Sequence, residues 1–331
     1  MENPISVDII NSIQESRCST LSQPSHSNFA ISGLPWHIRT NNQGILSIQE
    51  MEFLENHLQL VELMAFEEIE IQLTVHSPNV FLVIVMEGFF KYYHNDMLSF
   101  YGMGNCMYMA YIPQTILHLK ANKGKHSILV LALEKNWLQP APRPYPQISS
   151  LPAALASNSS EIIMLPMCAV KEPAKTLWTS MLRVRTNLMV HQIKLGNNIV
   201  QLIEYYHEQL QQGKILKKQL HVETANTIFE YIHTNLFIDS KLTLENMAYD
   251  IGISVWKLRE YSDLLLGQSI HKYVRDLRML NAKWLLETSN FPVGKIAIMT
   301  GYSNLPYFYQ TFRQYFEVSP NLYRKTIRKK I

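Results

Sequence analysis

The sequence predicts an α+β chain that combines an antiparallel β-barrel or sandwich with an all-α C-terminal domain. Three observations predict this fold class. Runs of β-type residues alternate with turn signals up to about residue 135, and a proline-rich stretch then marks a boundary. The last third of the chain instead carries apolar residues at helical spacing, arranged as two helix–turn–helix units joined by a linker helix.

The N-terminal strands are predicted from short β-type runs separated by turn signals at 76–78, 95–96 and 122–124. Such spacing is typical of an antiparallel sandwich or barrel. Residues before about Phe29 are rich in Ser, Gln and Asn, so we expect them to be disordered or peripheral. The predicted strands are IEIQLTV, NVFLVIVMEGFFKYYH, NCMYMAYIP, ILHLKA and HSILVLALE.

The middle of the chain begins with QPAPRPYPQISSLPAALASNSS, where alternating prolines predict an extended connection. Two helical stretches follow, KEPAKTLWTSMLRVRT and GNNIVQLIEYYHEQLQQ. The second has an apolar stripe that suits either a second copy of the chain or the chain's own barrel. Its members are Ile199, Leu202, Ile203, Tyr206 and Leu210. The predicted domains are therefore 1–138, 139–220 and 221–331.

The first helix–turn–helix unit is predicted from Leu242 to about Leu266. Thr243 can cap a helix, Gly252 permits a tight turn, and Ser254 can cap the helix SVWKLREYSDLLL. The apolar face of the first helix consists of Leu244, Met247, Ala248 and Ile251. A preceding helix, ETANTIFEYIHTNL, is expected to open the domain.

The second unit repeats this order, with Gly301 at the turn and Ser303 before YFYQTFRQYF. Its first helix has Val293, Ile296, Ala297 and Ile298 on one face. The linker IHKYVRDLRMLNAKWLLE carries one apolar stripe, with Lys272, Arg275, Arg278 and Lys283 scattered over its other faces. At 1.5 Å per residue it spans about 27 Å, enough to hold two recognition helices roughly one DNA turn apart.

The stretch from Leu242 to Arg324 resembles the DNA-binding domain of the AraC/XylS family of bacterial transcription regulators. The motifs that carry the resemblance are LTLENMAYDIGISVWKL, YVRDLRMLNAKWLLE and VGKIAIMTGYSNLPYFYQTFRQYFEVSPNLYRK. It implies a cupin-like sensor domain before the DNA-binding domain, helices that mediate homodimerisation, and activation through RNA polymerase. The chain departs from the family pattern at Glu260, Ser262, Pro306, Gln310 and Glu317, so the base code cannot be copied from relatives.

Charge and composition fit this resemblance. From Val222 onward there are 14 Lys and Arg against 10 Asp and Glu, whereas residues 1–221 hold 16 against 17. The three cysteines lie far apart without a CxxC motif, which predicts free thiols. We find neither a signal-like N-terminal stretch nor an apolar run of about eighteen residues, so we expect no membrane partner and a cytoplasmic protein.

The base-reading candidates lie near the start of each recognition helix, on its outward face. Arg can donate two hydrogen bonds to guanine, Glu can accept a hydrogen bond from the amino group of cytosine, and Gln can form two hydrogen bonds with adenine. Glu260 would be repelled by phosphate, so the first helix either reads a cytosine or contacts DNA less than the second. The base-reading candidates are Trp256, Arg259, Glu260, Asn304, Leu305, Tyr307 and Gln310. The phosphate candidates are Lys257, Arg313, Arg324 and Lys325, the last two in a basic tail that can equally be a solvated end.

The N-terminal domain offers aromatic side chains for a small-molecule effector with an amphipathic surface. These candidates are Trp36, His37, Phe90, Tyr92, Tyr93, Tyr108 and Tyr111, and each can equally be a core residue. His76, His94, His118 and His126 lie on four segments without a His-x-His pair, so we expect neither a metal nor another cofactor. No catalytic motif is found either.

The predicted function is sequence-specific binding of double-stranded DNA to regulate transcription, controlled by a small-molecule effector in the N-terminal domain. Activation is favoured over repression by the resemblance alone. Two alternatives remain open. The N-terminal domain can bind a protein partner instead, or it can be a metal-dependent cupin enzyme fused to a DNA-binding domain.

Overall fold

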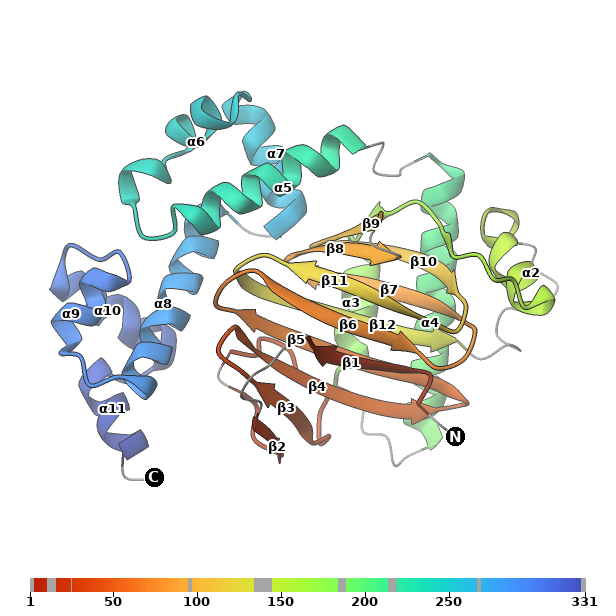
Figure 1. The fold of residues 1–331 in the computed structure, drawn as a ribbon, viewed down its shortest axis with the longest axis horizontal. Helices are drawn as coiled ribbons and strands as arrows, with labels where there is room; N and C mark the ends of the chain where they lie inside the picture. Colours follow the sequence, from red (N-terminus) through yellow and green to blue (C-terminus); the bar gives the residue numbers. More distant parts are fainter. Residues whose placement is uncertain are drawn as a thin grey trace. The chain divides into compact units, whose positions relative to one another are not determined.

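The computed structural model describes residues 3–10, 16–24, 26–94, 97–133, 145–183, 189–213, 219–266 and 269–328. It divides the chain into two compact units, residues 1–223 and 224–331. Figure 1 shows a first unit built around β-sheets and a helical second unit. The helical stretches that the sequence placed in a segment of their own, 139–220, belong to the first unit.

The first unit contains two antiparallel sheets. The smaller one has five strands, in the order β1 (Ile5–Ile9), β6 (Ile69–Val75), β11 (Thr115–Ala121), β8 (Phe89–His94) and β9 (Met97–Met103). The larger one runs β13 (Ile163–Met164), β10 (Cys106–Ile112), β7 (Asn79–Glu87), β12 (Gly124–Leu133), β5 (Asn56–Ala65), β4 (Gly44–Phe53), β3 (Trp36–Thr40) and β2 (Ser16–Thr20), and β14 (Cys168–Ala169) also pairs with β10. Apolar side chains from both sheets line one shared interior cavity, so the sheets pack face to face.

The five predicted runs after residue 68 all form strands, and the run NVFLVIVMEGFFKYYH is divided between β7 and β8. The strands β9, β13 and β14 and the strands before residue 68 were missed. The β4–β5 hairpin turns at Leu54 and Glu55, which both adopt a positive φ (44° and 62°). Two-residue hairpin turns usually have the sequence Asn-Gly or Asp-Gly, and this turn has neither. The expectation that residues before Phe29 are peripheral is wrong for β1, because Ile5, Val7 and Ile9 are buried against β6.

The helices of the first unit are η1 (Pro146–Ile148), α2 (Ser150–Ser157), α3 (Ala174–Met181) and α4 (Met189–Gln211). The stretch predicted as an extended connection thus contains a helix at 150–157, and its residues 139–144 lie outside the described residues. The predicted stripe of α4 packs against the large sheet, where Leu202 and Tyr206 are fully buried in one core with Met107 and Met109. The sequence left open whether this stripe packs on a second copy of the chain or on the chain's own barrel. In the structure it packs on the chain's own sheet.

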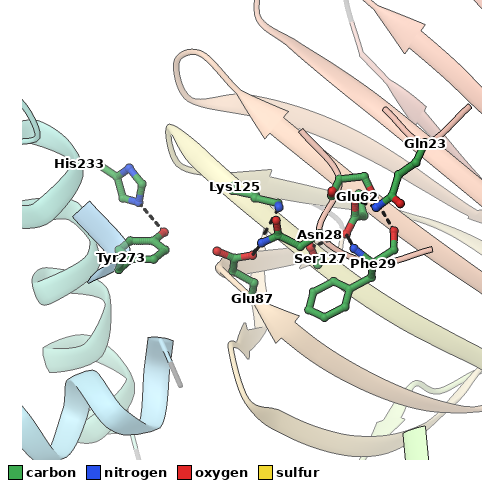
Figure 2. Close-up of polar contacts among 10 residues, drawn as sticks. Gln23, Asn28, Phe29, Glu62, Glu87, Lys125, Ser127, His233 and Tyr273 are labelled. Carbon is green, nitrogen blue, oxygen red and sulfur yellow. Dashed lines mark hydrogen bonds and ion pairs between the residues drawn. The ribbon is translucent and has the colours of Figure 1, made fainter. Parts of the chain in front are cut away.

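A buried polar patch lies on the large sheet, beside this core. Glu62 of β5 has no exposed surface, and its Oε1 accepts hydrogen bonds from the backbone N–H of Phe29 (3.1 Å) and the Ser127 hydroxyl (3.2 Å). The ammonium of Lys125, itself 1% exposed, lies 4.0 Å from Glu87 (Figure 2). The patch therefore holds one carboxylate and one ammonium away from water, beside the partly exposed carboxylate of Glu87.

The segment 26–34 covers part of this patch through hydrogen bonds to the sheet. His26 bonds the Ser47 hydroxyl (2.9 Å), and the backbone N–H of Ile31 donates to Gln49 (2.6 Å). These bonds give Ser47 and Gln49 partners, which offsets part of the cost of burying them. Ile31 of the segment is also buried in the apolar core, so polar and apolar contacts together hold the segment to the sheet.

Glu62 is expected to make stability depend on pH. Burial raises its pKa from 4.5 to about 7, with Lys125 opposing the shift, so the folded chain binds this proton more tightly than the unfolded chain. The free energy of unfolding should fall by at most about 3 kcal/mol as pH rises from 4.5 to 7. Buried His126, whose pKa is lowered from 6.5 to about 4, acts in the opposite direction between those two values.

Comparing the wild type with Glu62→Gln at each pH separates these two groups, because both proteins keep His126. Urea unfolding from pH 5 to 8 should show the glutamine variant gaining stability relative to the wild type, by about 2–3 kcal/mol over the range. A difference that does not change with pH would contradict the prediction.

The second unit contains eight helical elements in the described residues. They are α5 (Gln219–Thr234), η2 (Asp239–Lys241), α6 (Leu244–Ile251), α7 (Val255–Leu266), α8 (Ile270–Thr288), α9 (Val293–Met299), α10 (Leu305–Phe316) and α11 (Pro320–Arg328). The long helix α8 runs from the group of α5, α6 and α7 to the group of α9, α10 and α11 (Figure 1). His233 of α5 hydrogen-bonds the Tyr273 hydroxyl of α8 at 3.1 Å (Figure 2).

Local signals set the helix boundaries of this unit. The side chains of Thr243 and Ser269 accept backbone N–H groups at the starts of α6 and α8, and Ser254 does so for α7. Gly252 and Gly301 follow α6 and α9 with positive φ (77° and 82°), which suits glycine. Two predicted positions are wrong. Ile298 was placed on the apolar face of its helix but is 72% exposed, and Arg278 was placed outside the apolar stripe of the linker but is only 6% exposed.

Arg278 is buried because two segments distant in sequence supply three acceptors to its guanidinium. Nε donates to the Leu236 carbonyl (2.7 Å), and Nη1 donates to Asp239 (2.5 Å) and to the Gly301 carbonyl (3.2 Å). The Tyr302 ring centroid lies 5.9 Å away. One side chain of α8 therefore connects the region before α6 to the turn between α9 and α10.

Candidate nucleic-acid interface

Helix α7 presents an exposed face at its start. Trp256 is 73% exposed, and Arg259 and Glu260 are exposed as well, while Leu258 and Tyr261 point into the core. An exposed indole on a helix with a buried opposite face is free to contact a partner surface. The outward positions predicted for α7 are therefore exposed in the structure.

Helix α10 has the same organisation. Leu305 is 41% and Tyr307 is 55% exposed, Gln310 is exposed, and Phe308 and Phe312 are fully buried. A shared cap position also relates the two helices: Ser254 caps α7 and Asn304 caps α10. Counting from each cap, Glu260 and Gln310 occupy the same sixth position.

Asn304 caps the start of α10, a structural role that the sequence analysis did not predict. Its Oδ1 accepts the backbone N–H of Tyr307 at 2.9 Å, so only its amide NH₂ remains for a base or phosphate. One departure from the family pattern has a local explanation, because Pro306 lies in the first turn of α10, where its missing N–H costs little. Glu317 ends that helix with φ 63°, a conformation that favours glycine, and nothing in the structure explains the glutamate there.

The phosphate candidates do not share one environment. Lys257 is half-buried, with its ammonium 5.9 Å from the Tyr261 ring centroid, whereas Arg313 and Lys325 are exposed. Arg324 is half-buried on α11. The last basic residues, Lys329 and Lys330, lie outside the described residues.

A cleft of about 650 Å³ opens in the second unit between α8 and the starts of α6 and α10. It brings the candidates Asn304 and Tyr307 together with three residues that the sequence analysis did not single out, His271, Lys272 and Arg275. These three are exposed. Their alternation with the apolar stripe of α8 was visible in the sequence, but it did not show that they face a cleft.

The structure disperses the aromatic candidates of the first unit. Trp36 and Tyr111 belong to the core beneath α3 and α4, where Tyr111 donates to the Ser159 carbonyl at 2.7 Å. His37 lies in a separate, open polar groove beside Arg39 and Glu50. Tyr93 is half-buried on β8, where the Lys120 ammonium lies 5.2 Å from its ring centroid.

Phe90, Tyr92 and Tyr108 do lie together, around an apolar cavity of about 50 Å³ between the two sheets. Burial raises the pKa of Tyr92 to about 12, so its hydroxyl stays neutral. A cavity of this size holds very small molecules, since pockets for drug-sized ligands are roughly 300–1,000 Å³. A larger effector requires side chains around this cavity to move.

The described residues contain neither a metal-ligating cluster nor a membrane-spanning helix. Within them, no group of three or more His, Cys, Asp or Glu side chains is placed to hold a metal ion. Across the same ranges, no helix combines the length and apolar character needed to cross a membrane. All three cysteines are free, with Cys18 exposed and Cys106 and Cys168 buried.

Comparison with known proteins places the second unit among DNA-binding regulators. A family model described as a helix-turn-helix domain matches residues 247–326. The chain is similar to the multiple antibiotic resistance protein MarA of Escherichia coli (strain K12), with 32% identity over 103 residues, or 31% of this chain and 80% of MarA. The regulatory protein SoxS of Salmonella typhimurium is 31% identical over 104 residues, or 31% of this chain and 95% of SoxS.

A third relative is the HTH-type transcriptional activator AarP of Providencia stuartii, 28% identical over 106 residues, which are 32% of this chain and 77% of AarP. These matches agree with the capped helices, glycine turns and exposed faces of the second unit. The chain therefore belongs to the AraC/XylS family of DNA-binding transcription regulators.

Proposed function

We propose that this regulator reads two successive major-groove segments of one DNA duplex with α7 and α10. The observation that carries the proposal is the repeated arrangement of a short helix, a glycine turn and a capped helix with an exposed outer face. Helix α8 has 19 residues and so spans about 28 Å, which suits two reading helices about one DNA turn apart. A monomer can then contact both segments.

Base reading is assigned to the exposed face of each helix. Arg259 suits guanine, Gln310 suits adenine, and Glu260 suits the amino group of cytosine. Trp256, Leu305 and Tyr307 provide apolar contacts such as those made with thymine methyl groups. Lys257, Arg313, Arg324 and Lys325 are assigned to phosphates, and Asn304 is limited to its amide donor.

We propose homodimerisation through a second face of α4. Met189, Val190, Ile193 and Val200 are 78%, 73%, 59% and 38% exposed, although they are apolar. They recur at helical spacing on the side of α4 that faces away from the core, and such exposed apolar stripes commonly mark interfaces. A partner protein of another kind is the alternative occupant of this face.

The effector proposal concerns the cavity bounded by Phe90, Tyr92 and Tyr108. A small amphipathic molecule would place its apolar part there and its polar end near the two tyrosine hydroxyls. Its binding would shift the population of dimer arrangements, and thereby promote contact with RNA polymerase on cytoplasmic DNA. The name of AarP supports activation over repression.

Genomic-fragment selection with the purified protein at a stated salt concentration tests the proposed function. Recovery of fragments that share two short motifs about 10 base pairs apart is the expected result. Recovery without any shared motif would reject reading by two helices. Repeating the selection with a candidate effector present tests the effector proposal separately.

Glu260→Ala is expected to relax base preference at one position of the selected site. A good base contact discriminates by about 1–3 kcal/mol, so the preference for that base should fall by roughly ten- to a hundredfold. Gln310→Ala, at the same position counted from its cap, is the matched variant and should relax a position about one DNA turn away. Unchanged preference in Glu260→Ala would show that α7 does not read that base.

A further inference from the structure

The cleft of the second unit has a lining that differs from the two reading faces beside it. Apart from the start of α10, it is lined by the first turns of α8 and by the residues that precede α6. Its lining includes both hydroxyl groups and cations. The polar residues that matter here are Thr243, His271, Lys272, Arg275, Ser303 and Asn304.

The charge of this lining is positive. Lys272 and Arg275 are exposed on one face of α8, and His271 adds a third titratable nitrogen group. The acidic residue among the described lining is Asp239, whose carboxylate is already bound by Arg278 at 2.5 Å. Arg275 lies 3.8 Å from its neighbour Asp276 but keeps 46% of its side chain exposed.

Arg278 provides a second, independent observation. It is 94% buried and lines the cleft, and its Nη2 has no hydrogen-bond partner among the described residues. Buried guanidinium donors without a partner are costly, and a nearby anion lowers that cost. The unsatisfied donor therefore indicates that the cleft is built to accept negative charge.

We propose that this cleft holds the sugar–phosphate strand that crosses between the two major-groove segments read by α7 and α10. This inference rests on the proposed function. Lys272 and Arg275 contact phosphates, and Thr243 and Ser303 donate hydroxyl hydrogen bonds. Arg278, whose charge is offset by Asp239, places its unpaired Nη2 donor beneath them. Phosphates are bound by such cations and hydroxyls, and by helix N-termini such as that of α8, which Ser269 caps.

The position of the cleft favours a DNA strand as its occupant. Asn304 and Tyr307 lie at one side of the cleft and also at the start of the reading helix α10. A strand whose bases are read by α10 must continue past this start. A volume of about 650 Å³ accommodates several backbone atoms, and its open form suits a continuous strand.

The test measures the salt dependence of DNA binding by fluorescence anisotropy. The probes are a selected duplex and a random-sequence duplex, each of about 30 base pairs, long enough for two half-sites one DNA turn apart. Lys272→Gln/Arg275→Gln removes two cleft cations. Lys171→Gln/Lys175→Gln removes two exposed cations from the first unit and is the matched control for net charge.

The cleft variant should lower the slope of log affinity against log salt by about 1.8, because each phosphate contact contributes about 0.9. Between 50 and 200 mM salt, the wild type should then lose about tenfold more affinity than the variant. Binding to both duplexes should weaken equally, because phosphates carry no base identity. The control variant should keep the wild-type slope.

Three other results would contradict the phosphate assignment, the proposed function or the assignment to a DNA strand. A cleft variant with the wild-type slope would overturn the phosphate assignment while leaving the proposed function intact. A wild type that binds neither duplex would overturn the proposed function itself. Competition by inorganic phosphate, at ionic strength matched with chloride, would overturn the assignment to a DNA strand and identify a free-phosphate site.

Ethylation interference on the selected duplex provides a second readout. Ethylating the phosphates between the two motifs should block the wild type but have little further effect on Lys272→Gln/Arg275→Gln. Equal interference in both proteins would also overturn the inference. Both substituted side chains are exposed, so the variant is expected to fold, and circular dichroism during thermal unfolding checks this.

Discussion

Leu202→Ala is expected to lower the free energy of unfolding of the first unit by about 2–5 kcal/mol. Leu202 has no exposed surface and packs in the core that α4 shares with the large sheet, so truncation leaves a cavity that neighbouring side chains fill only partly. Urea unfolding monitored by circular dichroism measures the loss.

Ile193→Ala is the matched variant on the same helix. Ile193 is 59% exposed, so the folding free energy should change by about 0.5 kcal/mol or less. Its loss should instead weaken self-association, measured by sedimentation at several protein concentrations. A large stability loss with unchanged association would show that the outer face of α4 serves the fold and not a second copy.

Gly301→Ala is expected to destabilise the second unit by about 2–4 kcal/mol. The alanine would adopt the left-handed backbone of Gly301, at a cost of about 1–2 kcal/mol, and its Cβ would lie 2.9 Å from Cζ of Arg278. The Arg278 side chain cannot move away without losing its bonds to Leu236 and Asp239, each worth about 1–3 kcal/mol. Thermal unfolding of the full chain measures the effect.

Gly252→Ala separates backbone strain from the collision with Arg278. Gly252 has a similar φ (77°), but its added Cβ would meet nothing within 4 Å, so only the strain of about 1–2 kcal/mol is expected. In the background of Arg278→Met, Gly301→Ala should cost no more than Gly252→Ala does. Equal costs in the wild-type background would contradict the role assigned to Arg278.

The two glycine positions illustrate how much of the second unit could be predicted from sequence. Both turns, the caps Thr243 and Ser254 and the outward faces of α7 and α10 were predicted, because each depends on residues within one or two helical turns. The same reasoning placed Trp256 and Glu260 on the outer face. Exposure on the reading helices therefore follows from local periodicity.

The first unit was predicted less completely, because some of its strands lack clear signals in the neighbouring sequence. Its later strands carry clear turn signals, but the β4–β5 hairpin turns at Leu54 and Glu55, residues that seldom adopt positive φ. The strand β1 is five residues long and surrounded by polar sequence, so its alternation was hidden by composition. The strand β1 is held in place by pairing with β6, where Ile9 pairs with Ile71, 62 residues later in the chain.

The sequence by itself determined the α+β fold class, the family and the helices α7 and α10, because periodicity, caps and turns depend on neighbouring residues. Only the tertiary structure decided that the α4 stripe packs on the chain's own sheet, that Arg278 is buried, and that Lys272 and Arg275 line a cleft. A charge is buried when acceptors from distant segments converge on it, as Leu236, Asp239 and Gly301 do here. That convergence depends on how helices pack, and no local pattern records it.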